Sequence, residues 1–159
     1  MAAMSASKLD FTMVNYLSRD EFPGDSLEHV SADLILGLSE FRERLGAPIV
    51  PSPLVAGWYR KDGSKRSRHY AVGRLADGGD FFPRCDIRLA FLVATGCEWF
   101  GGIGVYLDTN GPSGRPEPMM HLDCRGKRTI WLRYEGRYIY PLADQDQFNE
   151  FWKRLNEVS

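Results

Sequence analysis

The chain has 159 residues, 43% of them apolar and 26% charged, with a formal net charge of −1. This composition is typical of a folded protein with one core, and it excludes a disordered chain. A net charge near zero gives no indication of nucleic-acid or membrane-surface binding, so we expect neither partner.

The cysteines and the N-terminal segment indicate the compartment in which the chain is made. Cys85, Cys97 and Cys124 include no CxxC pair, which predicts reduced, packed thiols and not a disulfide framework. Residues 1–22 hold no long apolar run, so the sequence predicts neither a secretory signal nor a membrane span. We therefore expect synthesis in the cytoplasm without a signal peptide.

The order of the predicted elements indicates one α+β domain over residues 1–159, with helices packed on a small antiparallel sheet. Residues 1–24 are expected to be irregular. The expected helices are 31–45, 84–96 and 143–158. The expected strands are 47–54, 102–108, 118–124, 128–134 and 138–140.

Capping and turn residues set the expected ends of several elements. Ser31 is the expected N-cap of the first long helix, and Gly46 is its expected C-terminal stop. The pairs at 126–127 and 135–136 both contain glycine and predict tight hairpin turns between the strands on either side.

Three histidines are the first candidates for chemistry. His29 precedes a helix and is expected to be a surface or capping residue. His121 lies on a predicted strand, where alternation places Met119, His121 and Asp123 on one face. Taken alone, His121 is better explained as a strand histidine that bonds a neighbouring residue.

The third histidine, His69, lies in the stretch SRHYAVGRLADGGDFFP, whose glycines allow close backbone approach. Asp80 follows it at the start of an apolar segment, where a carboxylate needs a partner. Two imidazoles and one carboxylate form a three-ligand zinc set with an open fourth position. Asp77 lies in the same stretch and remains an alternative to Asp80.

The order of motifs resembles the zinc D-Ala-D-Ala carboxypeptidases and L-alanyl-D-glutamate endopeptidases, most closely their small, phage-associated members. The resemblance covers residues 31–134 and no single motif in it is strong. The motifs in chain order are LILGLSEFRERLGAPIV, SPLVAGWYR, the SxH motif SRH, DFFP, GGIGVY and HLDCRGKRTIW.

This resemblance implies a zinc peptidase that hydrolyses an amide bond in peptidoglycan stem peptides. It implies that His69, Asp80 and His121 bind Zn²⁺ and that Arg60 stabilises the substrate carbonyl and its developing oxyanion. Ser67 is expected to support the ligand loop through hydrogen bonds. The implied place of action is the cell wall, reached after release or as part of a virion, with phage tail proteins as further candidate partners.

The chain departs from the family pattern at two places. The interval from His69 to an aspartate is longer than usual; Asp77 is nearer by count, whereas Asp80 has the small residue before it and the apolar residue after it that the family shows. The family's catalytic Glu or His before the last ligand is missing. Asp123 is the expected replacement, either as the base or as a residue that orients a ligand, and Glu117 is a weaker option.

These departures leave two other interpretations open. One is a catalytically weak or inactive zinc-binding module of a phage tail or assembly, which the missing base favours. The other is a plain α+β domain in which the histidines have no shared role.

Overall fold

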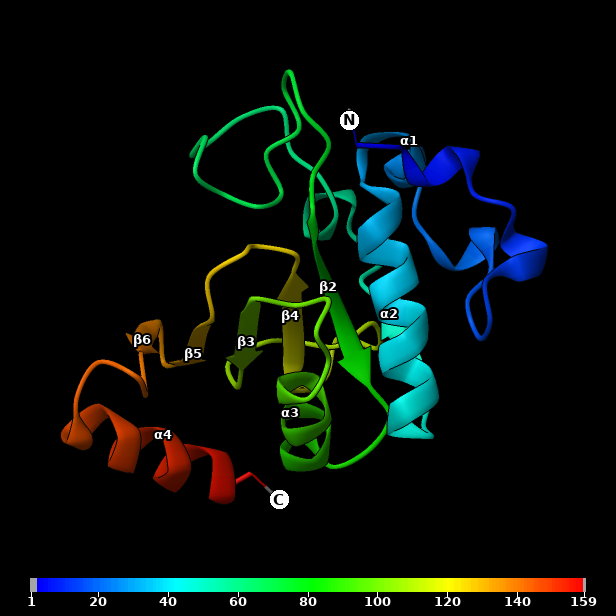
Figure 1. Ribbon diagram of the computed structural model, residues 1–159. Coiled ribbons are helices and arrows are strands. Elements are labelled where there is room, and N and C mark those ends of the chain that lie inside the picture. Colours follow the sequence, from blue (N-terminus) through cyan, green and yellow to red (C-terminus); the bar gives the residue numbers. More distant parts are fainter. Residues whose placement is uncertain (1–2, 159) are drawn as a thin grey trace.

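One six-stranded sheet forms the centre of the protein, which is described here by a computed structural model over residues 3–158 (Figure 1). The helices are α1 (Ser26–His29), α2 (Ala32–Leu45), α3 (Ile87–Thr95) and α4 (Gln145–Asn156). The strands are β1 (Ile49–Pro51), β2 (Gly78–Pro83), β3 (Gly102–Tyr106), β4 (Met119–Asp123), β5 (Thr129–Tyr134) and β6 (Arg137–Ile139). The expected α+β class is confirmed.

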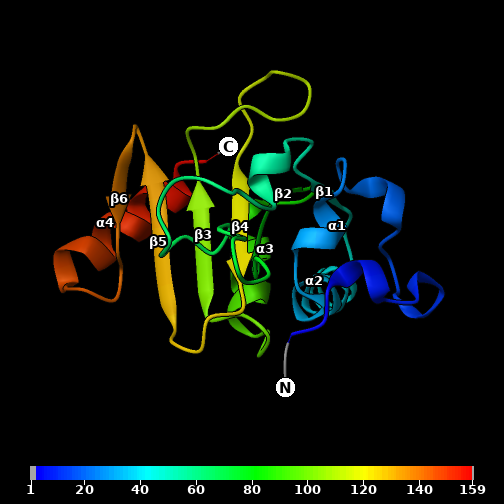
Figure 2. The same ribbon diagram turned by 90° about the horizontal axis from the view of Figure 1, so that it is seen from above.

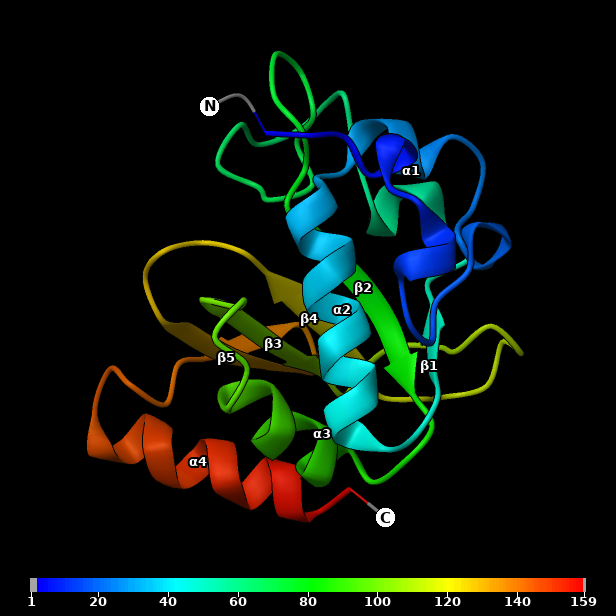
Figure 3. The same cartoon turned by 45° about the vertical axis from the view of Figure 1, so that its right-hand side comes forward.

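Helix α2 follows its predicted boundaries closely. The Ser31 hydroxyl accepts a hydrogen bond from the Leu34 N–H at 3.3 Å, and Gly46 ends the helix with φ 64°. Such caps satisfy backbone groups that the helix leaves free, and each contributes about 1 kcal/mol. Ahead of α2, residues 3–25 contain short 3₁₀ turns packed beside the helix (Figure 3).

The strand order is β1-β2-β4-β3-β5-β6, which Figure 2 shows from above. All neighbours are antiparallel except β3 and β5, which run parallel. The hairpin predicted at 126–127 is wrong, because β3 lies between β4 and β5. The turn predicted at 135–136 is confirmed: it joins β5 to β6, with Glu135 at φ 49° and Gly136 at φ 73°.

The two faces of the sheet have different neighbours. Helices α3 and α4 lie below the sheet in Figure 1, and the long segment 52–77 rises above it. Fully buried apolar side chains of the strands form the helix-side core; they are Phe81, Ile103, Val105, Met120, Leu122 and Leu132. No helix among residues 3–158 is long and apolar enough to cross a membrane.

Candidate metal centre

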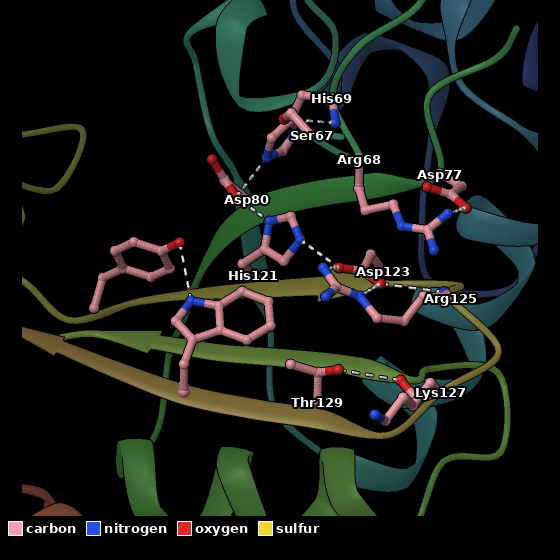
Figure 4. Close-up of polar contacts among 12 residues, drawn as sticks. Ser67, Arg68, His69, Asp77, Asp80, His121, Asp123, Arg125, Lys127 and Thr129 are labelled. Atoms are coloured by element: carbon pink, nitrogen blue, oxygen red, sulfur yellow. Dashed lines mark hydrogen bonds and ion pairs between the residues drawn. The ribbon is translucent and has the colours of Figure 1, made fainter. Parts of the chain in front are cut away.

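His69, Asp80 and His121 converge on the open face of the sheet (Figure 4). His69 comes from segment 52–77, Asp80 from β2 and His121 from β4. Asp80 Oδ1 lies 2.8 Å from His121 Nδ1 and 3.4 Å from His69 Nε2. The sequence prediction that these three side chains meet is therefore confirmed, and the structure selects Asp80 as the carboxylate.

Strand register explains why Asp80 and His121 meet. Backbone pairing places Asp80 opposite His121, His121 opposite Gly104, and Gly104 opposite Trp131. Directly opposite residues on adjacent strands have side chains in contact range. We call these four residues the metal row.

Each histidine has a partner for the nitrogen that faces away from Asp80. His69 Nδ1 lies 3.4 Å from the Trp58 carbonyl oxygen, and His121 Nε2 lies 2.9 Å from Asp123 Oδ2. Such partners fix the ring orientation and leave the other nitrogen for a metal. His69 Nε2 and His121 Nδ1 are the nitrogens thus left beside Asp80.

The cluster fits a divalent metal ion. One ligand atom from each residue lies within 4.8 Å of the other two. In a tetrahedral site with bonds of about 2.0–2.2 Å, two ligand atoms stand about 3.3–3.6 Å apart. The 3.4 Å between His69 Nε2 and Asp80 Oδ1 falls in this range, and the His121 contact needs only a small outward shift. Three protein ligands leave one position for a substrate or water.

Charge is concentrated around His121. Burial opposes the charge of the ring, but hydrogen bonds to Asp123 and Asp80 outweigh it and raise the His121 pKa to about 9. Burial likewise opposes ionisation of Asp80, and hydrogen bonds from His121 and His69 nevertheless hold its pKa below the usual value. A cation bound here would replace the Nδ1 proton, while Asp123 retains the proton on Nε2.

Asp123 lies behind His121 and not in the open site. Its side chain is fully buried, with His121 Nε2 at 2.9 Å and the Arg125 guanidinium at 2.6 Å and 2.7 Å. Burial opposes its charge, but the hydrogen bonds from His121 and Arg125 lower its pKa. Of the two roles considered for Asp123, this placement suits the orientation of a ligand and not proton transfer to a substrate.

Two glycines of β3 make room for these side chains. A Cβ on Gly102 would lie 2.2 Å from Asp123 Oδ2, and a Cβ on Gly104 would lie 2.4 Å from the Trp131 ring. No larger residue fits at either position without displacing its neighbour. The stretch GGIGVY entered the sequence analysis as one of the resembling motifs, but the need for glycine beside Asp123 and Trp131 was missed.

Arg60 and Ser67 form a small network next to His69. The Ser67 hydroxyl accepts hydrogen bonds from Arg60 Nη2 at 3.1 Å and from the His69 N–H at 3.3 Å. The Arg60 N–H also donates to the His69 carbonyl at 2.6 Å. The structure thus brings both residues to the site, with Ser67 in the supporting position expected for it.

The other candidates lie elsewhere. Asp77 pairs with Arg68 at 3.0 Å and is not one of the clustered ligands. Glu117 pairs with Arg84 outside the cavity. His29 remains near the surface, where its ring stacks against Tyr59.

The cluster of His69, Asp80 and His121 opens into a cavity of about 500 Å³. Five arginines line it: Arg60, Arg66, Arg68, Arg125 and Arg133. Three of them pair with the aspartates Asp77, Asp123 and Asp108, whereas Arg60 and Arg66 have no acidic partner among residues 3–158. Asp80 is the only carboxylate in the lining formed by the described residues. The cavity therefore suits an anionic ligand.

In comparisons with known proteins, no family model, no curated protein and no solved structure matches this chain. The inference of a function therefore rests on the residues of the site and on the resemblance of the sequence motifs.

Proposed function

We propose that the protein is a zinc-dependent peptidase that hydrolyses an amide bond in peptidoglycan stem peptides. The main support is the convergence of His69, Asp80 and His121 at the floor of an open cavity. Two imidazoles and a carboxylate suit zinc, which supplies a Lewis acid able to activate water and polarise a carbonyl near neutral pH. The peptidoglycan substrate, and action at the cell wall by a phage-derived protein, rest on the motif resemblance.

The residues around the cluster have separate roles in this proposal. Arg60, which donates a hydrogen bond to Ser67, stabilises negative charge on the substrate carbonyl oxygen through its charged guanidinium. Asp123 holds the His121 ring in orientation. The arginines of the cavity suit a stem peptide, since its free carboxylates are anionic.

A second candidate function is a zinc-binding module without turnover, as part of a phage tail or assembly. One observation favours it: the described lining holds no carboxylate other than Asp80, and Asp123 is occupied by His121 and Arg125. Proton transfer from an attacking water would then have no dedicated acceptor.

Metal analysis and a peptidoglycan assay separate these functions. We expect one zinc per chain in the wild-type protein, loss of zinc in Asp80→Ala, and retention in the matched variant Asp77→Ala. Release of new amino groups from purified peptidoglycan by wild type and by Asp77→Ala, but not by Asp80→Ala, would support the peptidase. Zinc without amine release would favour the module. Absence of zinc from the wild-type protein would reject both.

A further inference from the structure

Tyr106 lies next to the metal row on the open face of the sheet. It is paired with Met119 on one side and with Arg133 on the other. It lies two positions after Gly104 of the metal row, with only Val105 between them, so both residues face the same side of β3. Tyr106 lines the cavity together with His69, Asp80 and His121.

The hydroxyl of Tyr106 is turned back toward the metal row by Trp131. Trp131 Nε1 lies 3.1 Å from the Tyr106 hydroxyl oxygen. An indole N–H only donates, so the phenol oxygen accepts this bond and its own proton is left to donate. Among residues 3–158, Trp131 is the only hydrogen-bond partner of this hydroxyl. The cavity is the direction in which an acceptor can arrive.

Packing holds both rings in place. The Trp131 ring lies over Gly104, and its centroid is 5.4 Å from the centroid of the His121 ring. The Arg125 guanidinium lies 5.2 Å from the centroid of the Trp131 ring. The Tyr106 ring has the Arg133 guanidinium at 4.8 Å and the Tyr138 ring edge-to-face at 6.4 Å. A donor fixed before the ligand binds requires little reorganisation.

We propose that Tyr106 is a catalytic residue whose O–H donates a hydrogen bond to the substrate oxygen that gains negative charge at the metal centre. The proposal rests on the peptidase function above. It gives that oxygen a second donor besides Arg60 of segment 52–77, which lines the same cavity. Burial raises the pKa of Tyr106 above its usual value, and the neighbouring Asp80 charge acts in the same direction, so the phenol stays protonated.

The test uses Tyr106→Phe, which keeps the ring and removes the hydroxyl. Tyr140→Phe is the matched control, because Tyr140 is exposed and outside the cavity lining. We expect unchanged zinc content in both variants, and in Tyr106→Phe a fall in kcat of about 100-fold with KM changed less than about 3-fold. Tyr140→Phe should behave as wild type.

A binding measurement keeps this test independent of peptidase activity. Acetohydroxamate is titrated into the cobalt-substituted proteins and followed by visible absorption. We expect its affinity to fall about 10-fold in Tyr106→Phe and not in Tyr140→Phe, since one hydrogen bond to a charged oxygen is lost. If wild type releases no amines but acetohydroxamate binds more weakly to Tyr106→Phe than to wild type, the peptidase function is overturned and the role of Tyr106 as a donor is retained. Equal affinity and equal kcat in Tyr106→Phe would overturn the donor.

Discussion

Asp123 is the residue whose position most restricts the chemistry of the site. Its carboxylate is fully buried, and it holds the His121 ring on one side and the Arg125 guanidinium on the other. A buried charge needs such partners, because an unpaired one would cost several kcal/mol. Asp123, which the sequence offered as a replacement base, therefore contacts His121 and Arg125 and not the cavity.

Asp123→Asn tests this orienting role. The amide keeps the shape but removes the charge that holds the His121 Nε2 proton, so we expect zinc affinity to fall about 10- to 100-fold. Asp108→Asn is the control, since Asp108 pairs with an arginine of the cavity and touches neither histidine. Competition with a chelating dye measures both affinities. An unchanged affinity in Asp123→Asn would contradict the role.

A pH dependence follows for the metal-free protein. The His121 pKa is raised from 6.5 to about 9, so its contribution to stability is complete below about pH 6.5 and is lost as the pH rises through about 9. A shift of this size corresponds to a free energy on the order of 3 kcal/mol. Urea unfolding at pH 6 and pH 9.5 in EDTA measures the loss.

His121→Gln isolates this effect from other titrating groups. The variant lacks the imidazolium, so its free energy of unfolding should change less between the two pH values than that of wild type. His29→Gln, which leaves the buried cluster intact, should keep the wild-type difference. Equal pH dependence in wild type and His121→Gln would refute the assignment.

The choice between Asp77 and Asp80 could be made from the sequence only in part. Asp77 lies just before β2 and pairs with Arg68, whereas Asp80 lies within β2. The flanking residues favoured Asp80, and the structure pairs it directly with His121. Arg125 and Trp131 were missed as site residues, because their roles depend on contacts that no local pattern reveals.

At the scale of elements, local signals predicted helices better than strand pairing. Helix α2 begins and ends at its capping residues because these bonds are formed within the segment itself. Residues 126–127 contain a glycine suited to a tight turn, but they form no hairpin. Strand β3, which is distant in sequence from β5, pairs with both β4 and β5 and lies between them. The turn at 135–136 was predicted correctly because its strands are adjacent in the sheet.

A prediction at the scale of elements concerns the close packing of Gly102 in strand β3 against Asp123. In Gly102→Ala the new methyl would lie 2.2 Å from Asp123 Oδ2, a side chain with no room to move, so we expect a loss of about 1–3 kcal/mol in the free energy of unfolding. Gly126→Ala is the control, because nothing lies within 4 Å of its added Cβ. Urea unfolding of both variants checks the difference. Equal stabilities would contradict the close packing.

At the scale of the whole molecule, the candidate metal centre joins segment 52–77 to the sheet. Asp80 and His121 are held by the sheet, whereas His69 belongs to segment 52–77, most of which is exposed. Backbone hydrogen bonds join the ends of the segment to the rest of the molecule, through Ser52 and Ala76, whereas Arg60 bonds only within the segment, to His69 and Ala71. A bound metal would therefore attach the segment to the sheet through His69.

Limited trypsin digestion measures this attachment. Lys65 and Arg66 are exposed within the segment, and cleavage there needs a local opening that releases His69. At zinc concentrations about 100 times the dissociation constant, opening becomes about 2.7 kcal/mol less favourable, so cleavage should slow by about 100-fold. Cleavage at Lys8, which is exposed in the N-terminal segment, should keep its rate.

In Asp80→Ala zinc should give no protection at Lys65 and Arg66, because His121 would then be the only metal ligand left on the sheet. Protection in that variant, or equal slowing at Lys8, would show that zinc acts elsewhere on the molecule.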